Sequence, residues 1–171
     1  MNCHAGVSEL AVLSLNEVVV HKLHRNKRYN AKENPIMSEA PTPSYAFTVA
    51  LDVPFERARE QVVDALKAEG FGVLTEIDVK STMKQKIDVD FRKYAILGVC
   101  NPNLAHRALN IDLQMGLLLP CTAIVYEEDD GSVVSLLDPS IMREVAANPA
   151  LEPVAEEARA RLRRAIEALG G

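Results

Sequence analysis

Residues 94–109 read YAILGVCNPNLAHRAL, and this stretch sets the plan of the domain. Its first seven residues, Tyr94–Cys100, are apolar on both faces of an extended chain, which predicts a strand in the interior of a sheet. Asn101 followed by Pro102 is a strong helix start, with the asparagine as N-cap and the proline in the first turn. The sequence therefore predicts a buried strand that passes directly into a helix reaching about Leu109.

Further strands and helices are expected on both sides of this stretch. Residue alternation and turn signals predict strands over 45–51, 73–78, 121–127 and 132–137. Helical spacing predicts a helix between Asp52, as its cap, and Gly70, then others over 79–87, after Pro139, and over 151–169. The last of these is the longest and carries a narrow stripe of Ala and Leu, suited to packing on a sheet. We therefore expect one α+β domain over 44–171.

Composition excludes several classes of function. The chain has 171 residues, 48% of them hydrophobic, and a formal net charge of −5. This acidic balance argues against non-specific nucleic-acid binding, which needs a basic surface. No apolar run approaches the roughly 18 residues that span a bilayer, and we expect no membrane partner and a cytoplasmic location. The three cysteines include no CxxC pair, which excludes a zinc ribbon or a thioredoxin-like motif.

Residues 1–43 differ in composition from the rest and are predicted to be a poorly ordered N-terminal extension. The first 36 residues hold three of the four histidines and have five basic against three acidic residues. Met37, which is followed by residues of linker composition, is an alternative initiator methionine for the chain. Two interpretations stay open: a tail or misassigned start, and a basic, His-rich arm that binds metal or anions.

The candidate site lies around Cys100, where the strand meets the helix. The amides of a helix N-terminus stabilise negative charge, so a thiolate here is expected to have a lowered pKa. Asn101 stands at the helix start, His106 lies one turn into the helix, and Cys121 opens the next strand. If these two strands are adjacent and antiparallel, the two cysteines lie near each other at one end of the sheet.

Four interpretations of these residues remain open from the sequence. Cys100, His106 and Cys121 suit a metal site with a fourth ligand from elsewhere. Cys100 and His106 suit a nucleophile with its base, and the two cysteines suit a redox pair. The fourth is structural, with two cysteines in the core and a surface histidine, because free cysteine is among the most buried residue types.

Several blocks of the sequence together resemble the bacterial and archaeal domain of unknown function family 302. They are GVCNPNLAHRAL at 98–109, GLLLPC at 116–121, DDG at 129–131, DP at 138–139 and FGVLTEIDV at 71–79. The resemblance covers about residues 45–169. It implies a small α+β fold with an antiparallel sheet covered by helices, and a homodimer. It implies no activity, and it places Cys100 and Cys121 at the two cysteines of the family blocks.

Together these observations predict a dimeric module that binds a small ligand or a metal, with a redox link through the two cysteines as an option. The candidate ligand-binding or redox residues are Cys100, Asn101, His106 and Cys121. The alternatives are an enzyme with Cys100 as nucleophile and a structural or interaction protein without chemistry. The sequence names no substrate, cofactor or pathway, and it leaves enzymatic activity undecided.

Overall fold

The computed structural model describes residues 44–170, and the predicted extension over 1–43 lies outside them. In order along the chain the elements are β1 (Ala46–Leu51), α2 (Phe55–Ala68), β2 (Gly72–Asp78), α3 (Val79–Ile87), β3 (Tyr94–Cys100), α4 (Pro102–Ile111), the 3-10 helix η2 (Leu113–Leu117), β4 (Cys121–Glu128), β5 (Gly131–Leu137), α5 (Ser140–Ala146), the 3-10 helix η3 (Pro149–Leu151) and α6 (Glu152–Gly170). The predicted α+β class, with a long C-terminal helix, is confirmed.

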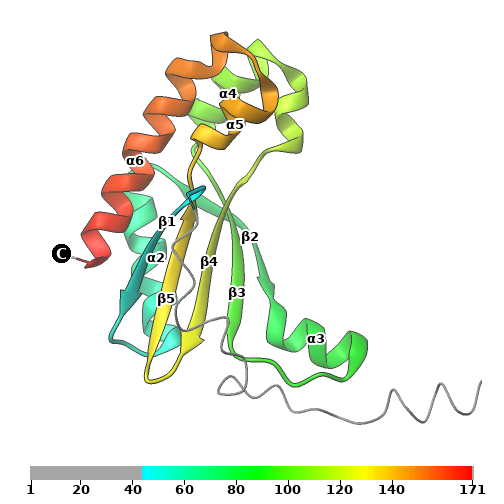
Figure 1. Ribbon diagram of the computed structural model, residues 1–171, viewed down its shortest axis with the longest axis vertical. Coiled ribbons are helices and arrows are strands. Elements are labelled where there is room, and N and C mark those ends of the chain that lie inside the picture. Colours follow the sequence, from blue (N-terminus) through cyan, green and yellow to red (C-terminus); the bar gives the residue numbers. More distant parts are fainter. Residues whose placement is uncertain (1–43, 171) are drawn as a thin grey trace, which may run out of the picture.

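The five strands form one sheet in the order β1-β5-β4-β3-β2, and each neighbouring pair is antiparallel (Figure 1). The apolar strand β3 lies between β4 and β2, so the prediction that it is an interior strand is confirmed. β4 and β5 form the hairpin that Asp130-Gly131 predicts. β2 and β1 are the two edges, and β2 carries a bulge between Val73 and Thr75.

The core lies between one face of the sheet and the helices α2 and α6, which pack against each other and the strands (Figure 1). From β3 this face presents Ala95, Leu97 and Val99, all at most 2% exposed. The buried positions of α6 include Leu162 and several alanines, which let the helix lie close to the sheet. Side-chain burial of this kind contributes about 25 cal/mol per Å² of apolar surface removed from water.

The remaining helices gather at the two ends of the sheet. α4, η2, α5 and η3 form a group beyond the point where β3 ends and β4 begins, and α3 lies beyond the opposite end, next to β2 (Figure 1). The turn that ends α2 contains Gly70, which has a φ of +82° and so adopts the left-handed conformation that favours glycine. The fold thus sets the junction of β3 and α4 beneath a group of short helices.

Candidate functional site

The junction of β3 and α4 is fixed by Asn101. Its side-chain oxygen Oδ1 accepts hydrogen bonds from the backbone N–H groups of Asn103 at 3.1 Å and Leu104 at 3.2 Å. Asn101 is 6% exposed and Pro102 is the first helical residue, as the sequence predicts. This cap satisfies two of the amides that a helix N-terminus leaves without an internal partner. The same amides are therefore not free to bind an anion.

Cys100 and Cys121 lie on adjacent antiparallel strands at one end of the sheet. Val99 of β3 is paired with Cys121 of β4, and Cys100 is the next residue along β3. The prediction that the strands of the two cysteines are neighbours is confirmed, and both thiols are free. Since successive side chains leave opposite faces of a strand, the two cysteines start from opposite faces. A disulfide between them would need the chain to rearrange.

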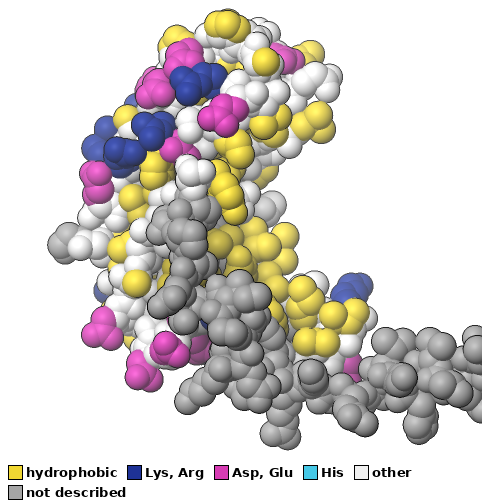
Figure 2. Space-filling model, in the orientation of Figure 1, with side chains coloured by type: hydrophobic (Ala, Val, Ile, Leu, Met, Phe, Trp, Pro, Cys, Tyr) yellow, Lys and Arg dark blue, Asp and Glu magenta, His cyan; other side chains and the backbone are white. Residues whose placement is uncertain are grey.

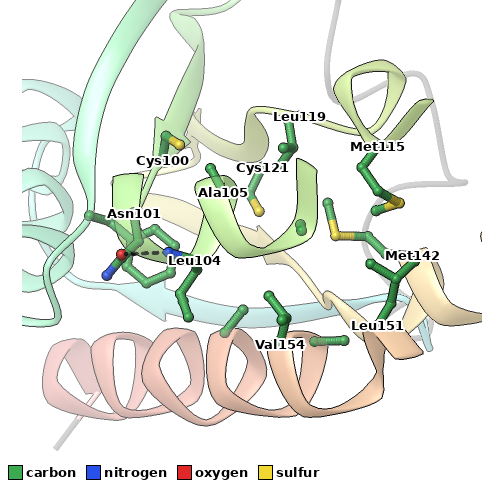
Figure 3. A pocket seen from close by; sticks show the side chains of 14 residues that line it. Cys100, Asn101, Leu104, Ala105, Met115, Leu119, Cys121, Met142, Leu151 and Val154 are labelled. Atoms are coloured by element: carbon green, nitrogen blue, oxygen red, sulfur yellow. Dashed lines mark hydrogen bonds between the residues drawn. The ribbon is translucent and has the colours of Figure 1, made fainter. Parts of the chain in front are cut away.

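A small cavity of about 30 Å³ lies between α4, α6 and the ends of β3 and β4. Its lining is almost wholly apolar, with Leu104 from α4 and Val154 from α6 among the contributors. Four sulfur-bearing residues also line it: Cys100, Cys121, Met115 and Met142. In Figure 3 the Cys121 side chain points into the space, and the sulfur of Cys100 lies at its edge. The cavity has room for one or two water-sized groups.

Both thiols are harder to ionise than a free cysteine. Burial raises the pKa of the Cys121 thiol to about 11, with a smaller contribution from the charge of Cys100. Burial also raises the pKa of Cys100. The expectation of a lowered pKa at Cys100 was therefore wrong. The helix amides that would stabilise a thiolate already bind the Asn101 side chain, and loss of water around the sulfur outweighs the helix dipole.

His106 does not line the cavity that the two cysteines share. It is exposed on α4, where the amide nitrogen of Asn110 donates to its Nε2 at 3.2 Å. Among residues 44–170, no three His, Cys, Asp or Glu side chains form a group that could hold a metal ion. The structure thus brings Cys100, Asn101 and Cys121 together but leaves His106 out. Within the described residues the metal site of Cys100, His106 and Cys121 is not assembled, and the hydrogen bond found for the His106 ring is to Asn110.

A larger hollow of about 370 Å³ lies between the start of α2 and the strands β2 and β3. Its charged side chains neutralise each other, because Arg59 pairs with Glu76 and Lys93 pairs with Glu56 at 2.9 Å. Of the other two charged groups, Asp78 accepts hydrogen bonds from Ser81 at the start of α3, and these bonds, together with the positive charge of Lys80, lower the pKa of Asp78. These internal pairs leave little unmatched charge with which to select a ligand.

Sequence reasoning missed the two methionines of the cavity. Met115 stands in η2, between α4 and β4, and Met142 follows Asp138-Pro139 in α5. No spacing relates either residue to the cysteines, since the four sulfurs come from four different elements. The only available signal was the apolar character of the segments, which predicts burial but not proximity.

Comparison with known proteins gives a family but no activity. The family model described as "Domain of unknown function DUF302" matches residues 47–169. A crystal structure of an uncharacterized conserved DUF302 protein from Bacillus stearothermophilus is similar, with 31% sequence identity and a TM-score of 0.69. The match covers 74% of this chain and 99% of that one.

None of the curated proteins matches. Within residues 44–170, the helices lack a stretch long and apolar enough to cross a membrane.

Proposed function

The chain belongs to the DUF302 family, and we propose that it is a homodimeric module that binds a small, largely apolar ligand in the cavity beside Cys100 and Cys121. The observation that carries the proposal is the convergence of four sulfur-bearing side chains on one apolar space. We place this activity in the cytoplasm, where free thiols are kept reduced.

The lining of the cavity supports a ligand with few polar groups. Hydrophobic and sulfur-bearing side chains offer dispersion contacts and almost no hydrogen bonds, so a polar ligand would lose its contacts with water without replacement. The Asn101 oxygen already accepts two backbone hydrogen bonds. Shape and contact with polarisable sulfur would therefore select the ligand.

The size of the cavity limits the ligand unless side chains move. About 30 Å³ holds one or two water-sized groups, and most small-molecule sites are ten or more times larger. Met115 and Met142 are unbranched and have several rotatable bonds, which lets them make room at low cost. We propose that they swing aside when the ligand enters. Oxidants would reach the site at the partly exposed Cys100, which would link binding to redox state.

Native mass spectrometry of the full chain, purified without chelator, tests this proposal. We expect the mass of a dimer with an added small mass that disappears on denaturation. Ala105→Leu places a larger side chain into the lining and should remove the added mass. Ala160→Leu, on the exposed side of α6, is the matched control and should keep it. An unliganded spectrum, or a ligand retained by Ala105→Leu, would contradict the cavity as the binding site.

A further inference from the structure

The face of the sheet that points away from α2 and α6 is apolar across three neighbouring strands. The strand register sets Ile77 of β2 opposite Ile96 of β3, and Ile96 opposite Ile124 of β4. In the next row Tyr94 and Tyr126 lie opposite each other, and their rings stack with centroids 5.5 Å apart. We call this surface the open face. Side chains from three strands thus make one continuous apolar surface.

Exposed apolar side chains continue this surface to its borders. Every residue of the edge strand β2 is exposed, and Leu74, in its bulge, and Ile77 are 64% and 48% exposed. Leu117 of η2 is 82% exposed and Ile87 of α3 is 62% exposed. Figure 2 shows hydrophobic side chains gathered over the middle of the sheet and in the hollow beside α3. Contiguous apolar patches of this kind mark interaction sites, unlike single exposed residues.

The charge of the open face restricts the kind of partner. The strand register assigns one acidic residue to it, Glu128 at the end of β4, and no Lys or Arg from any of the five strands. The solvent side of α6, by contrast, carries several arginines and glutamates. In a two-fold symmetric interface the same surface of each copy meets, so a surface dominated by one sign of charge would meet like charge. The Arg92 guanidinium lies over the Tyr126 ring, 5.9 Å from its centroid, so the open face holds one charge of each sign and avoids most of this cost.

We propose that the open face, bordered by β2, is the surface on which two copies of this chain join. This deepens the homodimer of the proposed function by naming its surface, and it does not depend on the ligand cavity. The similar DUF302 chain from Bacillus stearothermophilus matches over 99% of its length while covering 74% of this chain. It therefore lacks a counterpart of about a quarter of this chain, and the family model leaves residues 1–46 outside its match.

The open face and its borders must together supply the area of an interface. The whole sheet face, five strands spaced about 4.8 Å apart and about 20 Å long, has a flat area of roughly 400 Å², and the open face is the part of it over β2, β3 and β4. A standard interface needs roughly 800 Å² of accessible surface from each partner, and surface relief plus the borders must supply the difference. Leu117 and Ile87 lie on the segments at the two ends of the sheet, where they can extend the contact.

The test is the solution mass of the full chain, measured by light scattering at micromolar concentration. We expect a dimer for the wild type. Ile77→Glu should place two like charges in the interface and weaken dimerisation roughly a hundredfold or more, which gives the monomer mass. Ala160→Glu adds the same charge on the exposed side of α6 and should leave the dimer intact. A monomeric wild type, or an Ile77→Glu variant that stays dimeric, would overturn the proposal.

A second measurement uses the wild type alone, so its result does not depend on whether the Ile77→Glu variant folds. Amide hydrogen exchange of the wild type, compared at high and low concentration, should slow in β2 and β3 as the dimer forms. Exchange that slows only in other segments would place the interface elsewhere and overturn the proposal. Native mass spectrometry separates the two proposals: a ligand-free dimer contradicts the ligand site alone, and a liganded monomer contradicts this interface alone.

Discussion

The two faces of the sheet are made by the same strands yet differ in what covers them. On β3, Leu97 points towards α2 and α6 and is fully buried, while its neighbour Ile96 lies on the open face and is partly exposed. Both are large aliphatic residues, so composition does not distinguish the faces. Among residues 44–170, the helices α2 and α6 cover one face of the sheet. The other face is apolar as well, and in our proposal a second copy of the chain covers it.

The largest expected difference between the faces is in the cost of losing a side chain. Leu97→Ala should lower the free energy of unfolding by about 2 to 5 kcal/mol, because it leaves a cavity in a closed core. Ile96→Ala, one residue away on the open face, should cost about 1 kcal/mol or less in the monomer. Urea denaturation at low protein concentration, below dimer formation, measures both. Equal losses would show that the open face is as closely packed as the core.

The two cysteines provide a second comparison, because Cys121 belongs to the covered face. Its thiol stays protonated in the folded protein up to a pKa of about 11, whereas an unfolded thiol ionises near 9.0. The contribution of this thiol to the free energy of unfolding is therefore fully present below pH 9. It falls by about 2 to 3 kcal/mol as the pH rises from 9 to 11, because the unfolded thiol ionises first. The difference between the wild type and Cys121→Ala in the pH dependence of the free energy of unfolding isolates the effect of the Cys121 thiol from that of other titrating groups.

Alkylation distinguishes the same two thiols by access. In a Cys3→Ser background, iodoacetamide at pH 9 should modify the partly exposed Cys100 and leave the buried Cys121 unmodified until the protein unfolds. Equal reaction rates at the two sites would mean that the cavity opens readily to solvent, and the covered face would then be less closed than its burial indicates.

Two glycines test a smaller effect on the open face itself. A Cβ at Gly98 would lie 2.5 Å from Thr75 Oγ1 and 2.8 Å from Pro120 Cγ, so Gly98→Ala should cost about 1 to 3 kcal/mol. Gly72, on β2, has no atom within 4 Å of such a Cβ, and Gly72→Ala should be neutral or stabilising. Thermal melting measures both. A harmless Gly98→Ala would show that Pro120 does not close tightly onto β3.

The sequence predicted the parts of the fold whose signals are local. The passage from Tyr94–Cys100 into a helix capped by Asn101 follows from an apolar run and an Asn-Pro pair, and the structure has both. The prediction that the strands of the two cysteines are adjacent and antiparallel followed from the short connection between them. One local prediction failed: Asp52 does not cap α2, since Pro54 takes the cap position without a side-chain hydrogen bond.

The candidate site was less predictable because it depends on contacts between distant segments. The helix-terminus argument for Cys100 overlooked that Asn101 already occupies the amides and that burial acts in the opposite direction. Sequence spacing placed His106 one turn into the helix and left open whether it joins the cysteines or lies on the surface, and in the structure it is exposed. Met115 and Met142 reach the cavity only through the tertiary packing of η2 and α5.

The smallest expected effect comes from removing residues 1–36, and it tests whether this chain covers its own open face. A chain that begins at Met37 retains the whole matched region, residues 47–169, and should melt within a few degrees of the full chain. Its solution mass should also remain that of a dimer, because the proposed partner of Ile77 and Ile96 is a second copy. If the shortened chain instead lost several degrees and bound a dye for apolar surface more strongly, the N-terminal residues would be the cover. The apolar run between Leu10 and Val20 would then be the segment to examine, since eight of its eleven residues are Ala, Val or Leu. An unchanged melting temperature together with a dimer mass would leave the second copy as the partner that accounts for an apolar face on β3.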